Sequence, residues 1–113
     1  MTARKKNLKL SIIIPVYNEE QTVNELFNKV YRVKLQNIEK EIIIVDDGST
    51  DSSKRLINNL KKRYVNVKVF SSGINLGKGA AIRFGLMKST GVALIDCRGE
   101  TEAAAALRPA RET

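Results

Sequence analysis

The stretch that decides the fold is residues 41–51, Glu-Ile-Ile-Ile-Val-Asp-Asp-Gly-Ser-Thr-Asp. Its four β-branched apolar residues, Ile42 to Val45, follow one another without a polar break, which is typical of a strand buried on both faces of a parallel sheet. Asp46 and Asp47 come next, and Gly48 permits a sharp turn. Ligands of open α/β sheets bind beyond the carboxyl ends of the strands. The stretch therefore predicts a ligand site as well as a strand.

Apolar patterns on both sides of this strand alternate between strand and helix periods. Strands are predicted at residues 8–15, 42–45, 65–70 and 92–95, helices at about 20–33, 52–63 and 79–89, and a connection at 34–40. The third strand alternates apolar and polar residues, which favours a place near a sheet edge. The third helix is expected to turn Ala81, Ile82, Gly85 and Leu86 inward. The order βαβαβαβ, with right-handed crossovers, predicts an α/β fold with a parallel, Rossmann-like sheet.

Composition restricts the chemistry. The chain has 113 residues, a net charge of +8, one cysteine and no histidine, with an isoelectric point near 9.8. The charge indicates an anionic partner, but no RNA-reading or DNA-reading motif is present and aromatic residues are few, so no nucleic acid partner is expected. Disulfides, cysteine zinc sites and Ser-His pairs are excluded within the chain. Any metal would need carboxylate ligands, which favours Mg²⁺ or Mn²⁺.

Two segments are expected, residues 1–96 as the folded, ligand-binding unit and residues 97–113 as a mobile tail. The tail after Asp96 contains four consecutive alanines and no isoleucine, valine or aromatic residue. Neither a signal peptide nor an apolar run of membrane-spanning length is recognised, so a cytosolic setting is expected. The basic clusters, such as Lys61-Lys62-Arg63, are interpreted as solvated helix faces.

Three known kinds of nucleotide or phosphate site fit the sequence only in part. The Gly-x-Gly-x-x-Gly motif of dinucleotide folds is absent after the first strand, and the glycines before Lys78 are too closely spaced for a Walker A loop. A phospho-receiver domain is a stronger rival, because Asp46 and Asp47 end a strand and Asp96 falls near the spacing of a phosphoacceptor. Against it, a full βα unit precedes the acid pair and the downstream Thr and Lys positions are missing.

Three motifs in register resemble the start of the family 2 glycosyltransferases of the GT-A fold. They are Pro15-x-Tyr-Asn-Glu-Glu20, Val45-Asp-Asp-Gly-Ser-Thr-Asp51 and Asn75-x-Gly-Lys-Gly79, and the resemblance covers about residues 10–91. Within the family the chain looks most like the polyprenol-phosphate, or dolichol-phosphate, sugar transferases. The resemblance implies a nucleotide-diphospho-sugar donor of the GDP-mannose or UDP-glucose class. It also implies a polyprenyl phosphate acceptor at the cytosolic face of a membrane.

The same resemblance suggests which residues bind the nucleotide. They are Pro15, Tyr17, Asn18 and Glu19 after the first strand, Asp46 and Asp47 after the second, and Lys78 before the third helix. Asp46, with Asp47, is expected to bond the base or ribose, and Lys78 to lie near the diphosphate. Asp51 is interpreted as a helix cap, and a turn or cap is the structural alternative for Asp47.

The resemblance ends after Gly91, where the family supplies an Asp-x-Asp pair for a divalent ion. Here Asp96 is followed by Cys97 and Arg98, and a guanidinium cannot ligate a cation. Asp96 is thus the one predicted metal ligand, and catalytic residues are not identified. The chain is interpreted as the N-terminal half of a GT-A domain, truncated and of uncertain activity. The alternative is a nucleotide-binding fragment without catalysis.

Overall fold

The computed structural model describes residues 8–34 and 37–95, and Asp96 lies outside this part. Four strands and three helices alternate along it. They are β1 (Leu8–Val16), α1 (Val23–Arg32), β2 (Ile38–Asp46), α2 (Ser53–Arg63), β3 (Val67–Ser71), α3 (Lys78–Lys88) and β4 (Val92–Ile95). The predicted βαβαβαβ order is confirmed.

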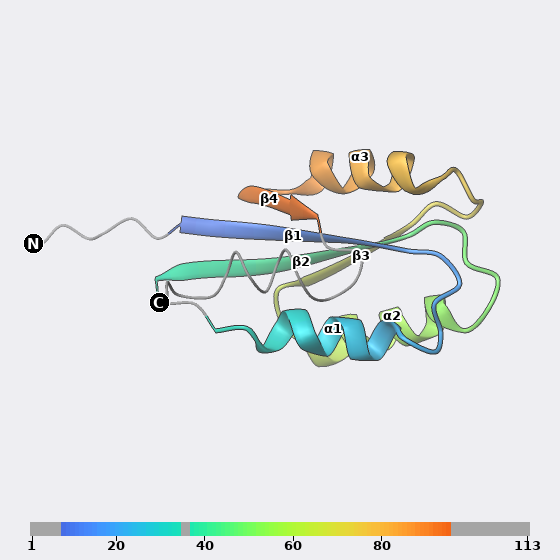
Figure 1. The fold of residues 1–113 in the computed structure, drawn as a ribbon, viewed down its shortest axis with the longest axis horizontal. Helices are drawn as coiled ribbons and strands as arrows, with labels where there is room; N and C mark the ends of the chain where they lie inside the picture. Colours follow the sequence, from blue (N-terminus) through green and yellow to red (C-terminus); the bar gives the residue numbers. More distant parts are fainter. Residues whose placement is uncertain (1–7, 35–36, 96–113) are drawn as a thin grey trace, which may run out of the picture.

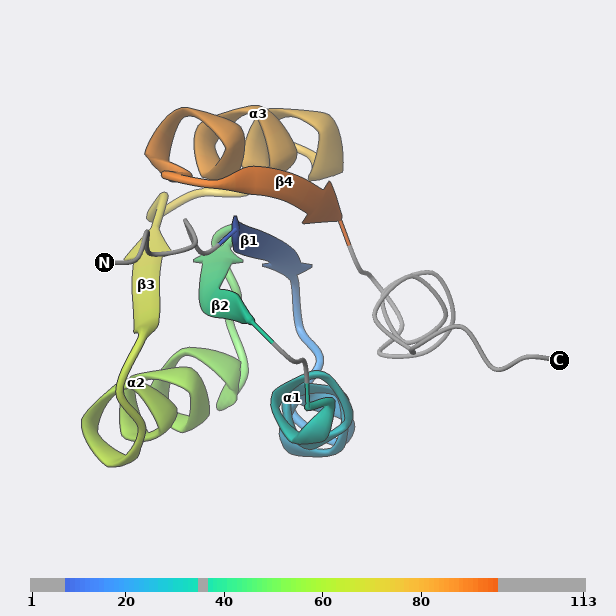
Figure 2. The same cartoon turned by 90° about the vertical axis from the view of Figure 1, so that its left-hand side faces the viewer.

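The four strands form one parallel sheet in the order β3-β2-β1-β4. Helices α1 and α2 cover one face of the sheet, and α3 covers the other (Figures 1 and 2). The expected Rossmann-like sheet is therefore present, and β3 lies at an edge as its alternating pattern predicted. All four carboxyl ends point the same way, which brings the loops after β1, β2 and β3 to one end of the molecule.

The two central strands are apolar without a break because both of their faces are covered. Ile12 and Ile14 pack into the core beneath α1 and α2, whereas Ile13 lies in the smaller core beneath α3. β2 divides in the same way, with Ile42 and Ile44 in the first core and Ile43 with Val45 in the second. Each of these isoleucines is at most 1% exposed. Alternation of side chains along a strand thus builds two cores from one apolar run.

Two glycines allow close approaches that a larger residue would prevent. At Gly85 a β-carbon would clash with the side chain of Ile13, so α3 packs directly against β1. Gly48 has φ of +77° and its α-carbon faces the backbone of Ile74 and Asn75, where no β-carbon fits. The turn after β2 therefore touches the loop that precedes α3.

Element boundaries differ from the expected ones at several places. β2 begins at Ile38, inside the predicted connection, and β3 begins at Val67 rather than Val65. Each of these strands follows an asparagine with positive φ, Asn37 or Asn66, a residue type that tolerates this conformation and ends the preceding segment.

Two helix predictions also need correction. α1 begins at Val23, because residues 20–22 form a turn that is bonded to the start of α2. The prediction that Leu86 faces inward is wrong: it is 41% exposed, whereas Ala81 and Gly85 are buried. Within the described part of the chain, no helix has both the length and the apolar character needed to cross a bilayer.

Candidate nucleotide-sugar site

The loop after β1 is joined to the loop after β2 by Asn18. Its side-chain oxygen accepts hydrogen bonds from the backbone N–H groups of Thr50, at 2.8 Å, and Asp51, at 3.3 Å. Its own N–H donates to the hydroxyl of Ser49 at 2.9 Å. Asn18 adopts a φ of +50°, which asparagine tolerates well. The two loops are therefore held as one unit.

The same unit is anchored to the start of α2. The N–H of Glu19 donates to the hydroxyl of Ser53 at 2.7 Å, and the carboxylate of Asp51 accepts from the N–H of Ser53 at 2.8 Å. Burial acts to raise the pKa of Asp51, but the hydrogen bonds from Ser53 outweigh it and hold the pKa below its usual value. Asp51 thus satisfies a free N–H of the first helical turn, although it precedes the N-cap residue, Ser52, by one position and is not itself the cap that was predicted.

Asp46 is fully buried at the end of β2. Its carboxylate accepts hydrogen bonds from the hydroxyl of Ser71 at 3.0 Å and from the N–H of Ser49 at 3.3 Å, and its carbonyl accepts from the N–H of Ser72. These contacts connect the end of β2 to its own turn and to the end of β3. Asp46 therefore holds the loop after β2 and the loop after β3 in place.

Asp47 holds the loop that precedes α3. One carboxylate oxygen accepts from the N–H of Leu76, and the other accepts from the N–H of Gly77 and the side-chain amide of Asn75, each at 2.9 Å. The N–H of Asp47 donates to the carbonyl of Val16 at 2.8 Å. With 3% of its surface exposed, Asp47 joins the loop after β1, the end of β2 and the loop before α3.

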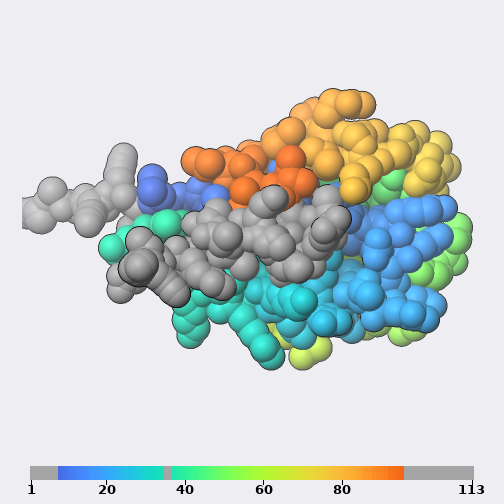
Figure 3. All heavy atoms as spheres, viewed as in Figure 1, coloured from blue at the N-terminus to red at the C-terminus, as the bar shows by residue number. Residues whose placement is uncertain are grey.

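A hollow of about 330 Å³ opens where these three loops meet, and we call it the loop hollow. In Figure 3 the segment after β1, in blue, and the segment before α3, in yellow, lie side by side at the end of the molecule where the loops gather. Tyr17 is 44% exposed there and offers an aromatic face to a ligand. The residues that line the hollow are Pro15, Val16, Tyr17, Glu19, Asp47, Asn75, Gly77 and Lys78.

The side of the loop hollow nearest α3 is suited to an anion. Lys78 is the first residue of α3, and its ammonium is exposed. The first turn of α3 contains no acidic residue, and no side chain caps it. Free N–H groups and the helix dipole attract negative charge at such a terminus. A diphosphate has the charge and the acceptor oxygens that fit this end of the hollow.

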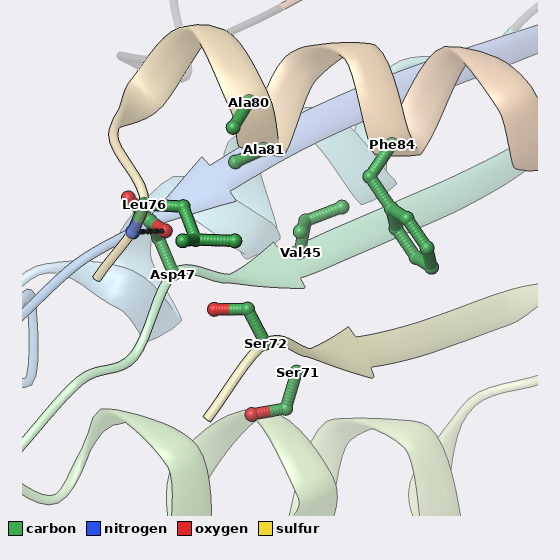
Figure 4. A pocket seen from close by; sticks show the side chains of 8 residues that line it. All are labelled: Val45, Asp47, Ser71, Ser72, Leu76, Ala80, Ala81 and Phe84. Carbon is green, nitrogen blue, oxygen red and sulfur yellow. Dashed lines mark hydrogen bonds between the residues drawn. The ribbon is translucent and has the colours of Figure 1, made fainter. Parts of the chain in front are cut away.

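A second cavity, of about 290 Å³, lies beneath α3 on the other side of Asp47 (Figure 4). Its walls are mostly apolar, with contributions from Val45, Leu76, Ala80, Ala81 and Phe84. Its two hydroxyl groups are already engaged, because Ser71 donates to Asp46 and Ser72 donates to the carbonyl of Ile74. It therefore offers little to a phosphate, and the loop hollow is the better anion site.

The structure brings together five of the seven predicted nucleotide-binding residues. Pro15, Tyr17, Glu19, Asp47 and Lys78 all line the loop hollow. Asn18 and Asp46 do not line it and instead hold its loops in place. Asn75 lines the hollow as well. It belongs to the third motif, but it was not among the predicted nucleotide-binding residues.

No metal centre is present in the part of the chain that the structure describes. Residues 8–34 and 37–95 contain no group of three or more Asp, Glu, His or Cys side chains placed to hold an ion. Asp96, the predicted metal ligand, is outside the described residues. The prediction of a Mg²⁺ or Mn²⁺ ligand at Asp96 therefore stays a prediction.

Sequence comparison identifies relatives of the whole folded part. A family model described as glycosyl transferase family 2 matches residues 11–96. A dolichyl-phosphate beta-glucosyltransferase of Trichomonas vaginalis is 35% identical over 101 residues, which cover 82% of this chain and 31% of that protein. A poly(ribitol-phosphate) beta-glucosyltransferase of Bacillus spizizenii is 42% identical over 76 residues, which cover 67% of this chain and 12% of that protein. The chain spans a third or less of the length of these curated relatives.

Solved structures show the same fold. S. aureus TarS 1-349 in complex with UDP aligns with a TM-score of 0.71 and 29% identity, over 81% of this chain and 28% of that one. The mannosyltransferase PcManGT of Pyrobaculum calidifontis, in complex with GDP-Man and Mn²⁺, aligns with a TM-score of 0.65 over 76% of this chain and 26% of that one. Its identity of 21% supports the fold alone. Fold, motifs and the family match agree, and the chain belongs to glycosyl transferase family 2.

Proposed function

We propose that the chain binds a nucleotide-diphospho-sugar, of the GDP-mannose or UDP-glucose class, in the loop hollow. The bound donor serves sugar transfer to an acceptor, polyprenyl phosphate, at the cytosolic face of a membrane. The observation that carries the proposal is the hollow itself, in which an exposed aromatic ring and a lysine at a helix N-terminus face one space. A base and a diphosphate need these two surfaces at one site.

The residues of the hollow divide the work between the two ends of the ligand. Pro15, Tyr17 and Glu19 form the wall for the base, and Lys78 with the N–H groups of α3 receives the diphosphate. Asp47 acts as a positioning residue, because its carboxylate fixes the backbone of Leu76 and Gly77 next to Lys78. Asn18 and Asp46 contribute in the same indirect way, by holding the loops that carry the wall.

The relatives support this choice of ligand and acceptor. One solved neighbour is a complex with UDP and another a complex with UDP-GlcNAc, both at 29% identity. The names of other relatives specify dolichyl phosphate and bactoprenol. Both names specify a glucosyltransferase together with a polyprenol-type lipid, which supports the proposed acceptor.

A divalent cation enters the proposal only through Asp96. The carboxylates described near the hollow are already engaged, because Asp46 and Asp47 accept hydrogen bonds from their own loops. They do not form a metal site among the described residues. Mg²⁺ or Mn²⁺ held at Asp96 would neutralise charge on a leaving diphosphate.

Isothermal titration with UDP-glucose and GDP-mannose, with and without Mn²⁺, tests donor binding. A Lys78→Ala variant is expected to bind at least tenfold more weakly, because a charge-assisted hydrogen bond contributes about 1.5–3 kcal/mol. Lys88→Ala, which removes the same charge from the other end of α3, is the matched control and should bind like the wild type. Equal losses in the two variants, or no binding of either donor, would overturn the proposal.

A product assay separates the enzyme from a module that only binds. Radiolabelled donor is incubated with polyprenyl phosphate, and the extracted lipid is counted. Donor binding without labelled lipid would support the alternative of a non-catalytic nucleotide-binding chain. The family match over residues 11–96 argues against the phospho-receiver alternative.

A further inference from the structure

Helix α2 carries more basic residues than either of the other two described helices. This helix carries five basic residues and no acidic one, and all five are exposed; they are Lys54, Arg55, Lys61, Lys62 and Arg63. None of the ion pairs found among the described residues involves α2. We call these five residues the α2 basic face.

Helix stability explains only half of this pattern. Cations in the last turn favour the negative end of the helix dipole, so Lys61, Lys62 and Arg63 have a local reason to be there. Lys54 and Arg55 lie in the first turn, where a cation meets the positive end of the dipole, and this turn has no acidic residue. The helix dipole therefore does not account for these two residues. The carboxylates at this end, Asp51 and Glu20, accept hydrogen bonds from the N–H groups of Ser53 and Ser52 and form no ion pair with Lys54 or Arg55.

The geometry of the helix gathers Lys54, Arg55 and Lys62 on one side, and Lys61 and Arg63 flank it. Ile57 and Leu60 face the core, and the opposite side looks outward. Arg55 and Lys62 are seven residues apart, about two turns, so they share that outward side. A shallow depression there is lined by Asp51, Ser52, Lys54, Arg55, Asn58, Asn59 and Lys62, so three cations outnumber one carboxylate. Several cations with amide donors between them suit the phosphate groups of lipid headgroups.

We propose that the α2 basic face docks the chain onto an anionic lipid surface. Clusters of four to eight basic residues are typical of helices that bind acidic lipids. α2 lies alongside α1 on the face of the sheet opposite α3 (Figure 2). The two helices together form a broad surface, which suits a membrane better than the groove of a nucleic acid duplex. No large apolar residue of α2 is exposed, so the attachment is electrostatic and reversible.

Nucleic acid fits this face less well. Single strands are bound by aromatic rings on which bases stack, and α2 contains no aromatic residue. Tyr64, directly after the helix, packs against Phe27 and Tyr31, with ring centroids 5.0 and 4.6 Å away. Its half-buried ring is therefore engaged in the core. Lipid binding is independent of the proposed donor site, since it uses no residue of the loop hollow.

Vesicle co-sedimentation of the full chain, without nucleotide, tests the proposal. The chain is expected to bind vesicles of phosphatidylcholine mixed with phosphatidylglycerol, and not phosphatidylcholine alone. Arg55→Gln with Lys62→Gln should weaken binding about 30-fold at low salt, because each cation near such a surface contributes about five- to sixfold. Arg83→Gln with Lys88→Gln removes the same two residue types from α3, on the opposite layer, and should have a much smaller effect.

A third variant separates docking from folding. Lys54→Glu improves the charge of the first helical turn, so it should melt at the same or a higher temperature while binding vesicles less. Equal losses in the α2 and α3 double variants would overturn the proposal in favour of non-specific charge. Binding to single-stranded RNA that is tighter than to vesicles, and that depends on Arg55 and Lys62, would overturn it in favour of nucleic acid.

Discussion

Two buried carboxylates lie toward opposite ends of β2, and they are used differently. In the first half of the strand, Glu41 is 3% exposed and accepts hydrogen bonds from Ser11 and from the N–H and hydroxyl of Thr90, the last two at 2.9 Å. Lys68 also reaches it, at 3.0 Å. At the end of the strand, Asp47 accepts its hydrogen bonds from the loop before α3.

The partners decide what each carboxylate does. Those of Glu41 belong to β1, β3 and the turn before β4, so it ties together segments that the sheet already brings close. Those of Asp47 belong to a loop that borders the loop hollow. A buried acid is therefore no sign of function by itself. Its partners distinguish an acid that stabilises the sheet from one that shapes a ligand site.

The sharpest way to test this comparison is to remove Glu41. A Glu41→Ala variant should lose about 3 kcal/mol of folding free energy, because the N–H of Thr90 and the hydroxyl of Ser11 lose a charged acceptor in a buried site. Urea unfolding measures the loss. At a temperature where the variant is folded, its affinity for the donor nucleotide should match that of the wild type. A weakened affinity would show that the two ends of β2 are coupled.

The pH dependence of stability should come next in size. Burial acts to raise the pKa of Glu41, but the hydrogen bonds from Ser11, Thr90 and Lys68 outweigh it and lower the pKa from 4.5 to about 2. A lowered pKa means that the folded state binds fewer protons than the unfolded state between these values. The stabilisation is therefore present above pH 4.5 and is lost as the pH falls toward 2, on the order of 3 kcal/mol in all.

Urea unfolding of the wild type and Glu41→Gln, repeated across this pH range, isolates the contribution. All other acids are common to the two proteins and cancel in the difference. The difference in unfolding free energy should shrink as the pH falls from 4.5. A difference that stays constant with pH would mean that Glu41 does not titrate differently in the folded state.

Replacing Asp47 should weaken donor binding more than stability, which is the opposite of what is expected for Glu41. Asp47→Ala removes three hydrogen bonds from an exposed loop whose N–H groups can turn to water, so the loss of stability should be smaller, about 1–2 kcal/mol. Donor affinity should fall at least tenfold, since the backbone next to Lys78 loses its anchor. Asp47→Asn, which keeps the shape and an acceptor, should recover part of the affinity. Unchanged affinity in both variants would remove Asp47 from the proposed site.

The smallest effect on stability is expected from Lys9, the more distant of the two lysines that contact Glu41. Lys9 approaches Glu41 only to 3.8 Å, and its side chain is 35% exposed. Exposed ion pairs contribute about 0–1 kcal/mol, so Lys9→Met should change stability by less than about 0.5 kcal/mol. Lys68→Met, at the 3.0 Å contact, should cost more. If Lys9→Met instead lost more unfolding free energy than Lys68→Met, the longer-range charge of Lys9 would matter more than the direct contact of Lys68.

Sequence patterns predicted the strands and their order because the apolar pattern that marks a strand or a helix lies within a short stretch of sequence. The run Ile42 to Val45 indicated a strand covered on both faces, and the structure places Ile42 and Val45 in different cores. The three motifs also identified the loops of the site, and five predicted residues line the hollow. Strand and helix starts were less accurate, since positive φ at Asn37 and Asn66 ends the preceding segment without an apolar signal.

By itself, the sequence determined the order of the elements, the parallel sheet and the family. Only the tertiary structure decided which acid borders the loop hollow and which does not. Asp46 and Asp47 are neighbours at a strand end, yet successive side chains of extended backbone diverge. One is therefore enclosed beside β3 and the other borders the hollow. The same holds for Glu41, whose partners Ser11 and Thr90 lie 30 and 49 residues away in the chain.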